Sequence, residues 1–509
     1  MNSSSPSPHP GDLPSARFGT GGVLFSMCLS LVLVVATVSA VNLALPDLAV
    51  DLGASNTSLT WIADGYTVAL AALVLPFGAV GDRIGRRRLL VLGTLVFGAA
   101  ALAAALSETA AALIAWRTVM GVGAAMIMPG TLSTITGAFP PEQRAKGVAT
   151  WAGFAAAGAI LGLLAAGALL EVWGWPSIFV ASAGVAVLAA VAAAVMAPET
   201  REAHPHRFDW LGGTSLAVAV GALVFAVIEG AEQGWTATPT LVAVALTVVG
   251  VGAYVVGGLR YESPLLDPRL FALRGFRTGG LTIVAQFMAL FGFFFVGLQY
   301  LQLLLDYSPL HSAVALIPVA VVVLPTALVT PAIVRRVGLG PVMGGGLILL
   351  AAGMVWVARL EVDSGYVPFL VGLMVAGVGI GLTSSTGTSA IVGALPAEKQ
   401  GVASAMNDAT REVGSALGVA LMGSVYGHAY RAALPEPPDV MPTEIVEAIR
   451  GSAAAGMEVA RQLGDVGEQL AVAVRSAFVE GLAASLTVVA AAIAVSAVVV
   501  LVRAPRTRS

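Results

Sequence analysis

The stretch Gly78-Ala-Val-Gly-Asp82-Arg83-Ile-Gly85-Arg86-Arg87-Arg88 separates two apolar runs, each of which is long enough to cross a bilayer. Lys and Arg are retained on the cytoplasmic side of membrane proteins, so this basic turn marks the cytoplasmic face of the chain. Gly85 suits a tight reversal because it has no Cβ atom. The turn sets the orientation from which every other span is counted.

The composition is that of a polytopic membrane protein. Of 509 residues, 57% are hydrophobic and 11% are charged, whereas a soluble domain carries about 25% charged residues. The net charge of -3 and the lack of a long basic block argue against nucleic-acid binding. Cys28 is the only cysteine, so a disulfide within the chain is excluded. We therefore expect membrane lipid, and no nucleic acid, as a partner.

Fourteen segments have the roughly 20 mostly apolar residues that a transmembrane helix needs. They are residues 23–46, 59–80, 89–106, 111–135, 148–170, 178–196, 211–228, 239–259, 279–305, 313–334, 342–357, 366–394, 402–427 and 478–502. Residues 1–20 are rich in Ser and Pro, and we expect them to form a disordered cytoplasmic tail. The predicted fold class is an all-α polytopic membrane protein.

The distribution of basic residues supports fourteen spans with both termini in the cytoplasm. The inner connections hold Arg83, Arg86, Arg87, Arg88, Arg144, Lys146, Arg201, Arg207, Arg260, Arg269, Arg274, Arg277, Arg335, Arg336 and Lys399. Before the thirteenth span, the outer connections hold only Arg359. One missed span would destroy this asymmetry.

An internal repeat divides the chain into halves. The segment 141–150, around Gly147, recurs as 396–404, around Gly401, 254 residues later. The basic turn has a weaker copy after the tenth span, beginning at Arg335. Parallel repeats of this kind predict two six-helix bundles. We expect the N-terminal bundle over residues 21–197, two inserted helices with their loops over 198–276, and the C-terminal bundle over 277–505.

The long connection 428–477 interrupts the rhythm of spans. It opens with a Pro-rich segment and then alternates apolar and charged residues at helical spacing, as in Ile445 and Ile449 beside Glu444 and Glu447. The spacing predicts an amphipathic hairpin on the outer face. A disordered loop is the alternative.

Carboxyl groups inside apolar spans cost about 2.5–3.5 kcal/mol even on a permissive insertion scale, so they indicate function. Asp64 lies in the span 59–80, and Asp408 and Glu412 lie in 402–427. The latter two are four residues apart and share a helix face. A carboxyl group in a medium of low dielectric favours its protonated form, and a second carboxylate nearby strengthens this preference. The pair therefore predicts a proton site that an approaching cation can empty.

Each acid also has a structural interpretation. Arg411 lies between Asp408 and Glu412 in the chain, and it could neutralise one of them as an ion pair. Asp64 is about 9 Å from the outer end of its span, counted at 1.5 Å per residue. Its carboxylate could extend to the interface beside Tyr66. Both interpretations stay open at the level of sequence.

Arg117 is the basic group deep in the N-terminal half. A buried arginine needs an acidic or carbonyl partner, and a choice between partners suits a proton relay. Phe291, Phe295 and Gln299 lie in the span 279–305, where aromatic side chains could line an apolar drug cavity or simply pack. We expect Tyr66 and Arg411 at the same cavity.

Several of these segments resemble a known family. The pattern Gly78-x-x-x-Asp82-Arg83-x-Gly85-Arg86-Arg87 resembles the loop between helices 2 and 3 of the major facilitator superfamily of secondary transporters. The Arg117 segment resembles the superfamily's helix 4 motif, and 41–46, with Asn42, resembles the end of helix 1 in the fourteen-helix drug:proton antiporters. Trp61-x-x-Asp64-x-Tyr66 and the paired acids are most similar to exporters of quaternary ammonium and other lipophilic cations.

The resemblance implies roles for these residues. Proton coupling and substrate binding fall to Asp64, Asp408, Glu412, Arg117 and Asn42. A conformational latch falls to Gly78, Asp82, Arg83, Gly85, Arg86 and Arg87. The chain departs from the family pattern at Thr37, where an Asp is usual, and in 158–167, which lacks the usual Pro and one Gly.

We therefore expect a proton-coupled multidrug efflux antiporter of the cell membrane. It would act as a monomer on small lipophilic compounds and protons, without a cofactor or metal. An exporter of a neutral or anionic metabolite or self-made antibiotic is the nearer alternative, and a non-transporting receptor is the remoter one. The sequence shows no phosphate loop, nucleophile–base pair or metal cluster, so we do not expect an enzyme.

Overall fold

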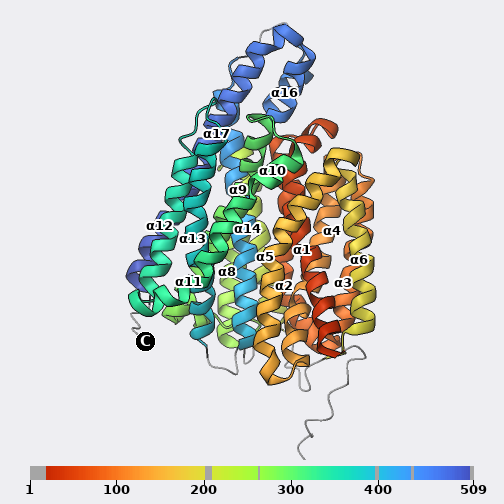
Figure 1. The fold of residues 1–509 in the computed structure, drawn as a ribbon, viewed down its shortest axis with the longest axis vertical. Coiled ribbons are helices and arrows are strands. Elements are labelled where there is room, and N and C mark those ends of the chain that lie inside the picture. The colour runs from red at the N-terminus through yellow and green to blue at the C-terminus, as the bar shows by residue number, and fades with distance from the viewer. Residues whose placement is uncertain (1–18, 201–208, 262–263, 396–399, 437–440, 505–509) are drawn as a thin grey trace, which may run out of the picture.

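The computed structural model describes residues 19–200, 209–261, 264–395, 400–436 and 441–504. Within these ranges the chain forms helices and no strand. Figure 1 shows the long helices side by side along one axis, with the start of α1 and the end of α17 at the same end of the molecule. The predicted all-α class is confirmed.

The first six long helices form the N-terminal bundle. They are α1 (Gly19–Asp51), α2 (Asn56–Ile84), α3 (Arg86–Ala105), α4 (Ala110–Ala138), α5 (Pro141–Trp173) and α6 (Pro176–Met196). Two inserted helices follow, α7 (Trp210–Gln233) and α8 (Thr238–Arg260), and then the short helix η1 (Pro268–Ala272).

The C-terminal bundle contains the remaining long helices and a small hairpin. Its members are α9 (Arg274–Leu303), α10 (Pro309–Ala315), α11 (Ile317–Val337), α12 (Leu339–Val357), α13 (Tyr366–Gly393), α14 (Gln400–Ala433), α15 (Thr443–Gly451), α16 (Ala453–Gln462), η3 (Gly464–Gly467) and α17 (Glu468–Arg503). We call the end that carries α15 and α16 the outer end and the opposite one the inner end (Figure 1).

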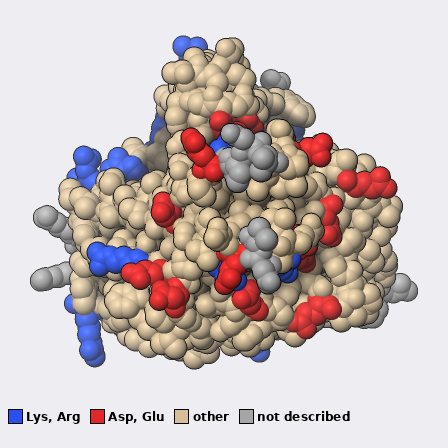
Figure 2. Space-filling view, turned by 90° about the horizontal axis from the view of Figure 1, so that it is seen from above, with Lys and Arg blue, Asp and Glu red and all other residues tan. Residues whose placement is uncertain are grey.

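Twelve spans of the described chain are long and apolar enough to cross a membrane, with α10 and α11 together forming one of them. α5 and α14, of 33 and 34 residues, run beside these helices and complete the fourteen predicted spans (Figure 1). Figure 2 looks onto the outer end, where acidic side chains are spread across the face and the basic ones lie mainly toward one edge. This acidic face agrees with the charge asymmetry of the sequence.

Equivalent helices pair in the two bundles. α1 packs against α5 and α6, just as α9 packs against α14 and α17. α3 packs against α4 and α6, just as α12 packs against α13 and α17. The repeat around Gly147 and Gly401 predicts this correspondence of helices. The bundles meet along two seams, α2 against α14 and α5 against α10.

The structure corrects the sequence at two places. The predicted span 313–334 is broken at Leu316, because Pro318 begins a new helix and cannot donate a backbone hydrogen bond to the preceding turn. The last span starts at Glu468, ten residues before the predicted 478. α17 packs on α16, and the mixed apolar and charged sequence of its first turns concealed their helical structure. The predicted outer hairpin is present as α15 and α16.

Candidate transport site

Asp64 lies in the third turn of α2 and is completely buried. Neither of its carboxylate oxygens has a hydrogen-bond partner within the described chain. The structural alternative, in which the side chain reaches the outer interface, does not hold in this structure. A buried carboxyl group without a hydrogen-bond partner is costly, so packing alone does not explain an acid at this position.

Arg117 of α4 is also completely buried and faces α2. Its Nε donates to the Ile62 carbonyl at 3.0 Å and its Nη2 donates to the Ala63 carbonyl at 3.3 Å. Its guanidinium carbon lies 4.8 Å from the centre of the Tyr66 ring. Nη1 has no partner among the residues that the structure describes. Arg117 therefore binds carbonyls and an aromatic face, and its charge acts on Asp64 from beyond ion-pair distance.

Close contact between α2 and α4 creates this arrangement. An added Cβ atom on Gly121 would collide with the Tyr66 carbonyl oxygen, and one on Gly65 would lie 2.9 Å from the Thr118 hydroxyl. Tyr66 is held on the other side by its hydroxyl, which donates to the Val34 carbonyl of α1 at 3.2 Å. Small residues at this crossing thus bring the guanidinium of Arg117 against the backbone of α2.

The paired acids of α14 lie in its third and fourth turns, in the inner half of the helix. Asp408 is buried and Glu412 is partly exposed. Arg411 acts on both acids electrostatically, yet its guanidinium carbon sits 4.7 Å from the centre of the Phe287 ring of α9. In the part of the chain that the structure covers, no ion pair within 4.0 Å joins Arg411 to either acid. The structural interpretation of Arg411 as a fixed counter-ion therefore does not describe this conformation.

The α2 and α14 groups approach each other across a seam between the bundles. Glu412 is close enough to Tyr66 to act on it electrostatically, although the two residues belong to opposite bundles. Asp64 and Tyr66 thus lie on the α2 side of this seam, and Asp408 and Glu412 lie on the α14 side. A relative motion of the bundles would change the surroundings of both sides.

The side chains predicted to line a cavity fall into two groups. Tyr66, Phe295 and Gln299 are buried in this conformation, and Gln299 donates to the Phe295 carbonyl at 2.8 Å. Phe291 and Arg411 are partly exposed, and Phe291 stacks on Phe287 with a centroid distance of 6.0 Å. Their role as cavity lining stays a prediction.

Asn42 is buried in α1, within the segment 41–46 that resembles the family motif. Its Nδ2 donates to the Val38 carbonyl at 2.9 Å, and its Oδ1 has no partner within the described ranges. A free amide oxygen in a buried position can accept a hydrogen bond from a substrate or water.

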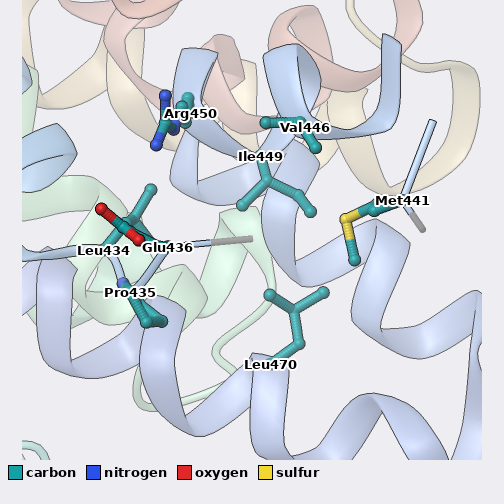
Figure 3. Close-up of a pocket in the computed structure, with 8 residues that line it drawn as sticks. All are labelled: Leu434, Pro435, Glu436, Met441, Val446, Ile449, Arg450 and Leu470. Carbon is teal, nitrogen blue, oxygen red and sulfur yellow. The ribbon is translucent and has the colours of Figure 1, made fainter. Parts of the chain in front are cut away.

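A cavity of about 80 Å³ lies at the outer hairpin. Its walls are Leu434, Pro435, Glu436, Met441, Val446, Ile449, Arg450 and Leu470, and Figure 3 shows the apolar ones converging. Small-molecule sites usually measure about 300–1,000 Å³. This cavity is too small for a drug-sized ligand and belongs to the packing of the hairpin.

The basic turn joins four helices at the inner end. Arg86 pairs with Asp82 at 2.8 Å, and its Nη1 donates to the Ser133 carbonyl of α4 at 3.2 Å. Gly85 has a φ of 114°, which side chains rarely tolerate, as the sequence predicted for a tight reversal. Gly78 faces Pro129 of α4. Arg83 ends α2.

Glu199, just after α6, is a partner of this turn that sequence reasoning missed. It lies 3.6 Å from Arg87 and 3.5 Å from Arg88, and Arg87 also donates to the Ala197 carbonyl at 3.3 Å. The connection 197–209 mixes acidic and basic residues, so its composition did not single out Glu199. Through Glu199 the turn also holds the end of α6.

The outer end of the bundle interface is closed. Asn56 of α2 donates to the Gly423 carbonyl of α14 at 2.8 Å, and Gln302 of α9 donates to the Leu43 carbonyl of α1 at 3.0 Å. On the second seam, the Ser308 hydroxyl donates to Glu171 at 2.5 Å. All of these bonds lie in the outer halves of their helices.

Known proteins resemble the chain over nearly its full length. The "Multidrug efflux pump LfrA" of Mycolicibacterium smegmatis is 31% identical over 90% of this chain and 91% of its own length. The "Methyl viologen resistance protein SmvA" of Salmonella typhimurium is 32% identical over 84% of this chain and 88% of its own. The "Methylenomycin A resistance protein" of Streptomyces coelicolor is 32% identical over 81% of this chain and 86% of its own.

The fold and the family agree. A bacterial homologue of the human lysosomal transporter Spinster, solved in an inward-facing and unoccupied conformation, matches with a TM-score of 0.68 at 14% identity. The match covers 98% of this chain and 100% of that chain, and at this identity it bears on the fold alone. The family model of the Major Facilitator Superfamily matches residues 27–419. The chain therefore belongs to the Major Facilitator Superfamily.

Proposed function

We propose that the chain exports lipophilic cationic compounds across the cell membrane in exchange for protons. The single observation that carries the proposal is the burial of acids on both helices of the α2–α14 seam, Asp64 on α2 and Asp408 on α14. Two relatives, a multidrug efflux pump and a methyl viologen resistance protein, have names that point to the same class of substrate.

The proposed cycle uses the closed outer end as its inward-facing state. A cation entering from the cytoplasm or the inner leaflet approaches Asp408 and Glu412 and displaces a proton. Opening of the outer end then releases the cation, and the acids take up a proton from outside. Arg117 holds α2 through the Ile62 and Ala63 carbonyls, so its charge stays beside Asp64 during the exchange.

The basic turn would serve as the inner latch. Arg86 ties α2 to α4, and Glu199 ties the same turn to α6, so the inner end of the N-terminal bundle moves as one unit. With the positive-inside rule, this end faces the cytoplasm together with both termini.

The energy source suffices for uphill export. Each pH unit of gradient supplies about 1.36 kcal/mol per proton. Each 100 mV of membrane potential supplies about 2.3 kcal/mol per charge moved. A proton-motive force of this order sustains a drug gradient of at least tenfold, since tenfold corresponds to about 1.4 kcal/mol.

Ethidium uptake into everted membrane vesicles tests the proposal. We expect energised vesicles to accumulate ethidium, and a protonophore to abolish the accumulation. Asp408→Asn and Glu412→Gln should each lower it at least tenfold. Glu108→Gln, which alters an exposed acid at the outer end, is the matched control and should transport normally. Protonophore-resistant accumulation would contradict the proposed coupling.

One observation favours a second candidate substrate class. Arg411 is partly exposed beside Phe287, and no described residue forms an ion pair with it, so it offers a positive charge to a neutral or anionic substrate. The name of the Streptomyces relative, a methylenomycin A resistance protein, fits export of an antibiotic. Arg411→Gln should leave ethidium export intact and abolish transport of such a substrate.

A further inference from the structure

The inserted helix α7 packs on α2 along its whole length. Near the inner end, an added Cβ atom on Gly213 would lie 3.5 Å from Pro76 of α2. At mid-length, Gly221 faces Val68. Near the outer end, Trp61 donates from its ring nitrogen to Glu229 at 3.0 Å. One turn further out, the Thr57 hydroxyl donates to Glu232 at 2.9 Å.

α7 also contacts α14 of the C-terminal bundle, in addition to α2. Val224 and Ile228 of α7 form a small apolar cluster with Ala416 and Ala420 of α14. Further out, the Ser424 hydroxyl donates to the Val227 carbonyl at 3.1 Å. This apolar cluster and this hydrogen bond both lie in the outer half of α7.

Glu232 joins both neighbours. Besides accepting from Thr57 of α2, the same oxygen lies 2.7 Å from Nη2 of Arg431, in the last turn of α14. The arginine and glutamate side chains of this ion pair are 27% and 38% exposed. The pair therefore connects an inserted helix to the C-terminal bundle at the end that the proposed cycle opens.

We propose that α7 moves with the N-terminal bundle and that its outer half forms a releasable outer latch on α14, fastened by the Glu232–Arg431 ion pair. The named contacts of α7 with α2 extend from Gly213 to Glu232, whereas those with α14 extend from Val224 to Glu232, so α2 holds the inner half of α7 as well. The inference rests on the proposed alternation of the two bundles. It assigns a function to the inserted pair that neither bundle supplies.

The strength of the ion pair suits a latch that opens in every cycle. Half-exposed pairs of this kind change an equilibrium roughly one- to fivefold, because they compete with solvated charges. The apolar cluster of α7 and α14 separates at the same time. A fully buried pair would hold the outer end closed too firmly for repeated opening.

Distance measurements between spin labels at Leu106 and Asp363 test the proposal. These exposed positions lie at the outer ends of opposite bundles. The measurement uses the full chain in lipid nanodiscs, with the buried Cys28 replaced by Ala and without substrate or pH gradient. The ratio of the long-distance to the short-distance population then reports how often the outer end opens.

Arg431→Gln should raise the open-to-closed ratio roughly two- to fivefold. Thr57→Val is the matched control, because it removes the hydrogen bond between Glu232 and α2, the helix that moves together with α7. This variant should leave the ratio unchanged. Exchange of the charges in Glu232→Arg with Arg431→Glu should restore the original ratio. Ser424→Ala provides a second break on the α14 side and should shift the ratio in the same direction as Arg431→Gln.

An unchanged open-to-closed ratio in Arg431→Gln would overturn the inference. So would a shift of this ratio in Thr57→Val that equals the shift in Arg431→Gln, or a shift in Thr57→Val alone. The last would mean that α7 travels with the C-terminal bundle. Failure of proton coupling is distinguishable, because it would abolish ethidium accumulation while leaving these distance ratios as expected.

Discussion

Asp64 and Arg117 are enclosed side by side in the N-terminal bundle, yet they do not form an ion pair within the described structure. The guanidinium of Arg117 donates hydrogen bonds to two backbone carbonyls, and its flat face lies over the ring of Tyr66. Asp64 is left without a bonded partner. A carboxyl group in this position can gain and lose a proton without breaking a fixed pair.

Asp64→Asn should abolish proton-coupled export while preserving the fold. The amide has nearly the same shape, and the carboxylate oxygens have no described partner to lose, so the change in stability should stay below about 1 kcal/mol. Ethidium accumulation and the apparent melting temperature, measured on the same preparation, check both parts. Normal, protonophore-sensitive export by this variant would exclude Asp64 from coupling.

Arg117→Met separates charge from packing at the neighbouring position. Methionine fills much of the arginine volume, and removal of a buried charge often costs little stability. We expect the variant to fold and to lose transport by at least tenfold. If transport survives, Arg117 acts only through packing.

The depth of Asp64 illustrates what sequence alone left open at this scale. Its position in the chain was compatible with a side chain at the interface, because helix rise gives distance along the axis but not direction around it. The direction follows from contact with α4, where Gly121 admits the backbone of α2. Glu229 and Glu232 were missed for a related reason, since acids in the last turn before an outer connection resemble loop residues.

At the scale of elements, the α2–α4 crossing positions the site, and it depends on Gly121. An added methyl group there would collide with the Tyr66 carbonyl oxygen. Gly184 on α6 has no atom within 4 Å of its Cβ position in the described chain.

Gly121→Ala should therefore lower stability by about 1–3 kcal/mol, as overpacking does, and should reduce transport. Gly184→Ala is the matched control and should be neutral or stabilising by up to about 1 kcal/mol, because alanine favours a helix. Thermal unfolding in detergent compares the two. Equal stability of the two variants would contradict the prediction, because it would show that α4 can shift to accommodate the added methyl group at position 121.

The basic turn gives a second prediction for elements. Arg86 is 22% exposed and holds both Asp82 and the Ser133 carbonyl, whereas Arg88 is 73% exposed and lies 3.5 Å from Glu199. Arg86→Gln should cost about 1–2 kcal/mol. Arg88→Gln should cost less than about 0.5 kcal/mol. Unfolding curves at low salt compare the stabilities of the two variants. An equal loss of stability in both would contradict this prediction.

At the scale of the whole molecule, hydropathy and charge were enough to predict fourteen spans, and the internal repeat predicted two bundles. Each span must satisfy its own backbone, and each connection must respect the positive-inside rule, so local composition carries the topology. The break at Leu316 has a signal in the sequence, Pro318, whereas the early start of α17 has none, because it depends on packing against α16 outside the apolar core. The closed outer end was likewise hidden, since it rests on single bonds such as Asn56 to the Gly423 carbonyl.

The central claim is that a substrate cation and a proton compete for the acids at the α2–α14 seam. Purified protein in liposomes, loaded with a pH-sensitive dye and given ethidium on one side only, measures this exchange directly. Proton movement opposite to ethidium should appear with the wild-type chain, persist in Glu108→Gln and vanish in the combined Asp408→Asn, Glu412→Gln variant. Ethidium transport without proton movement in the wild type, or unchanged proton movement in the double variant, would contradict the account.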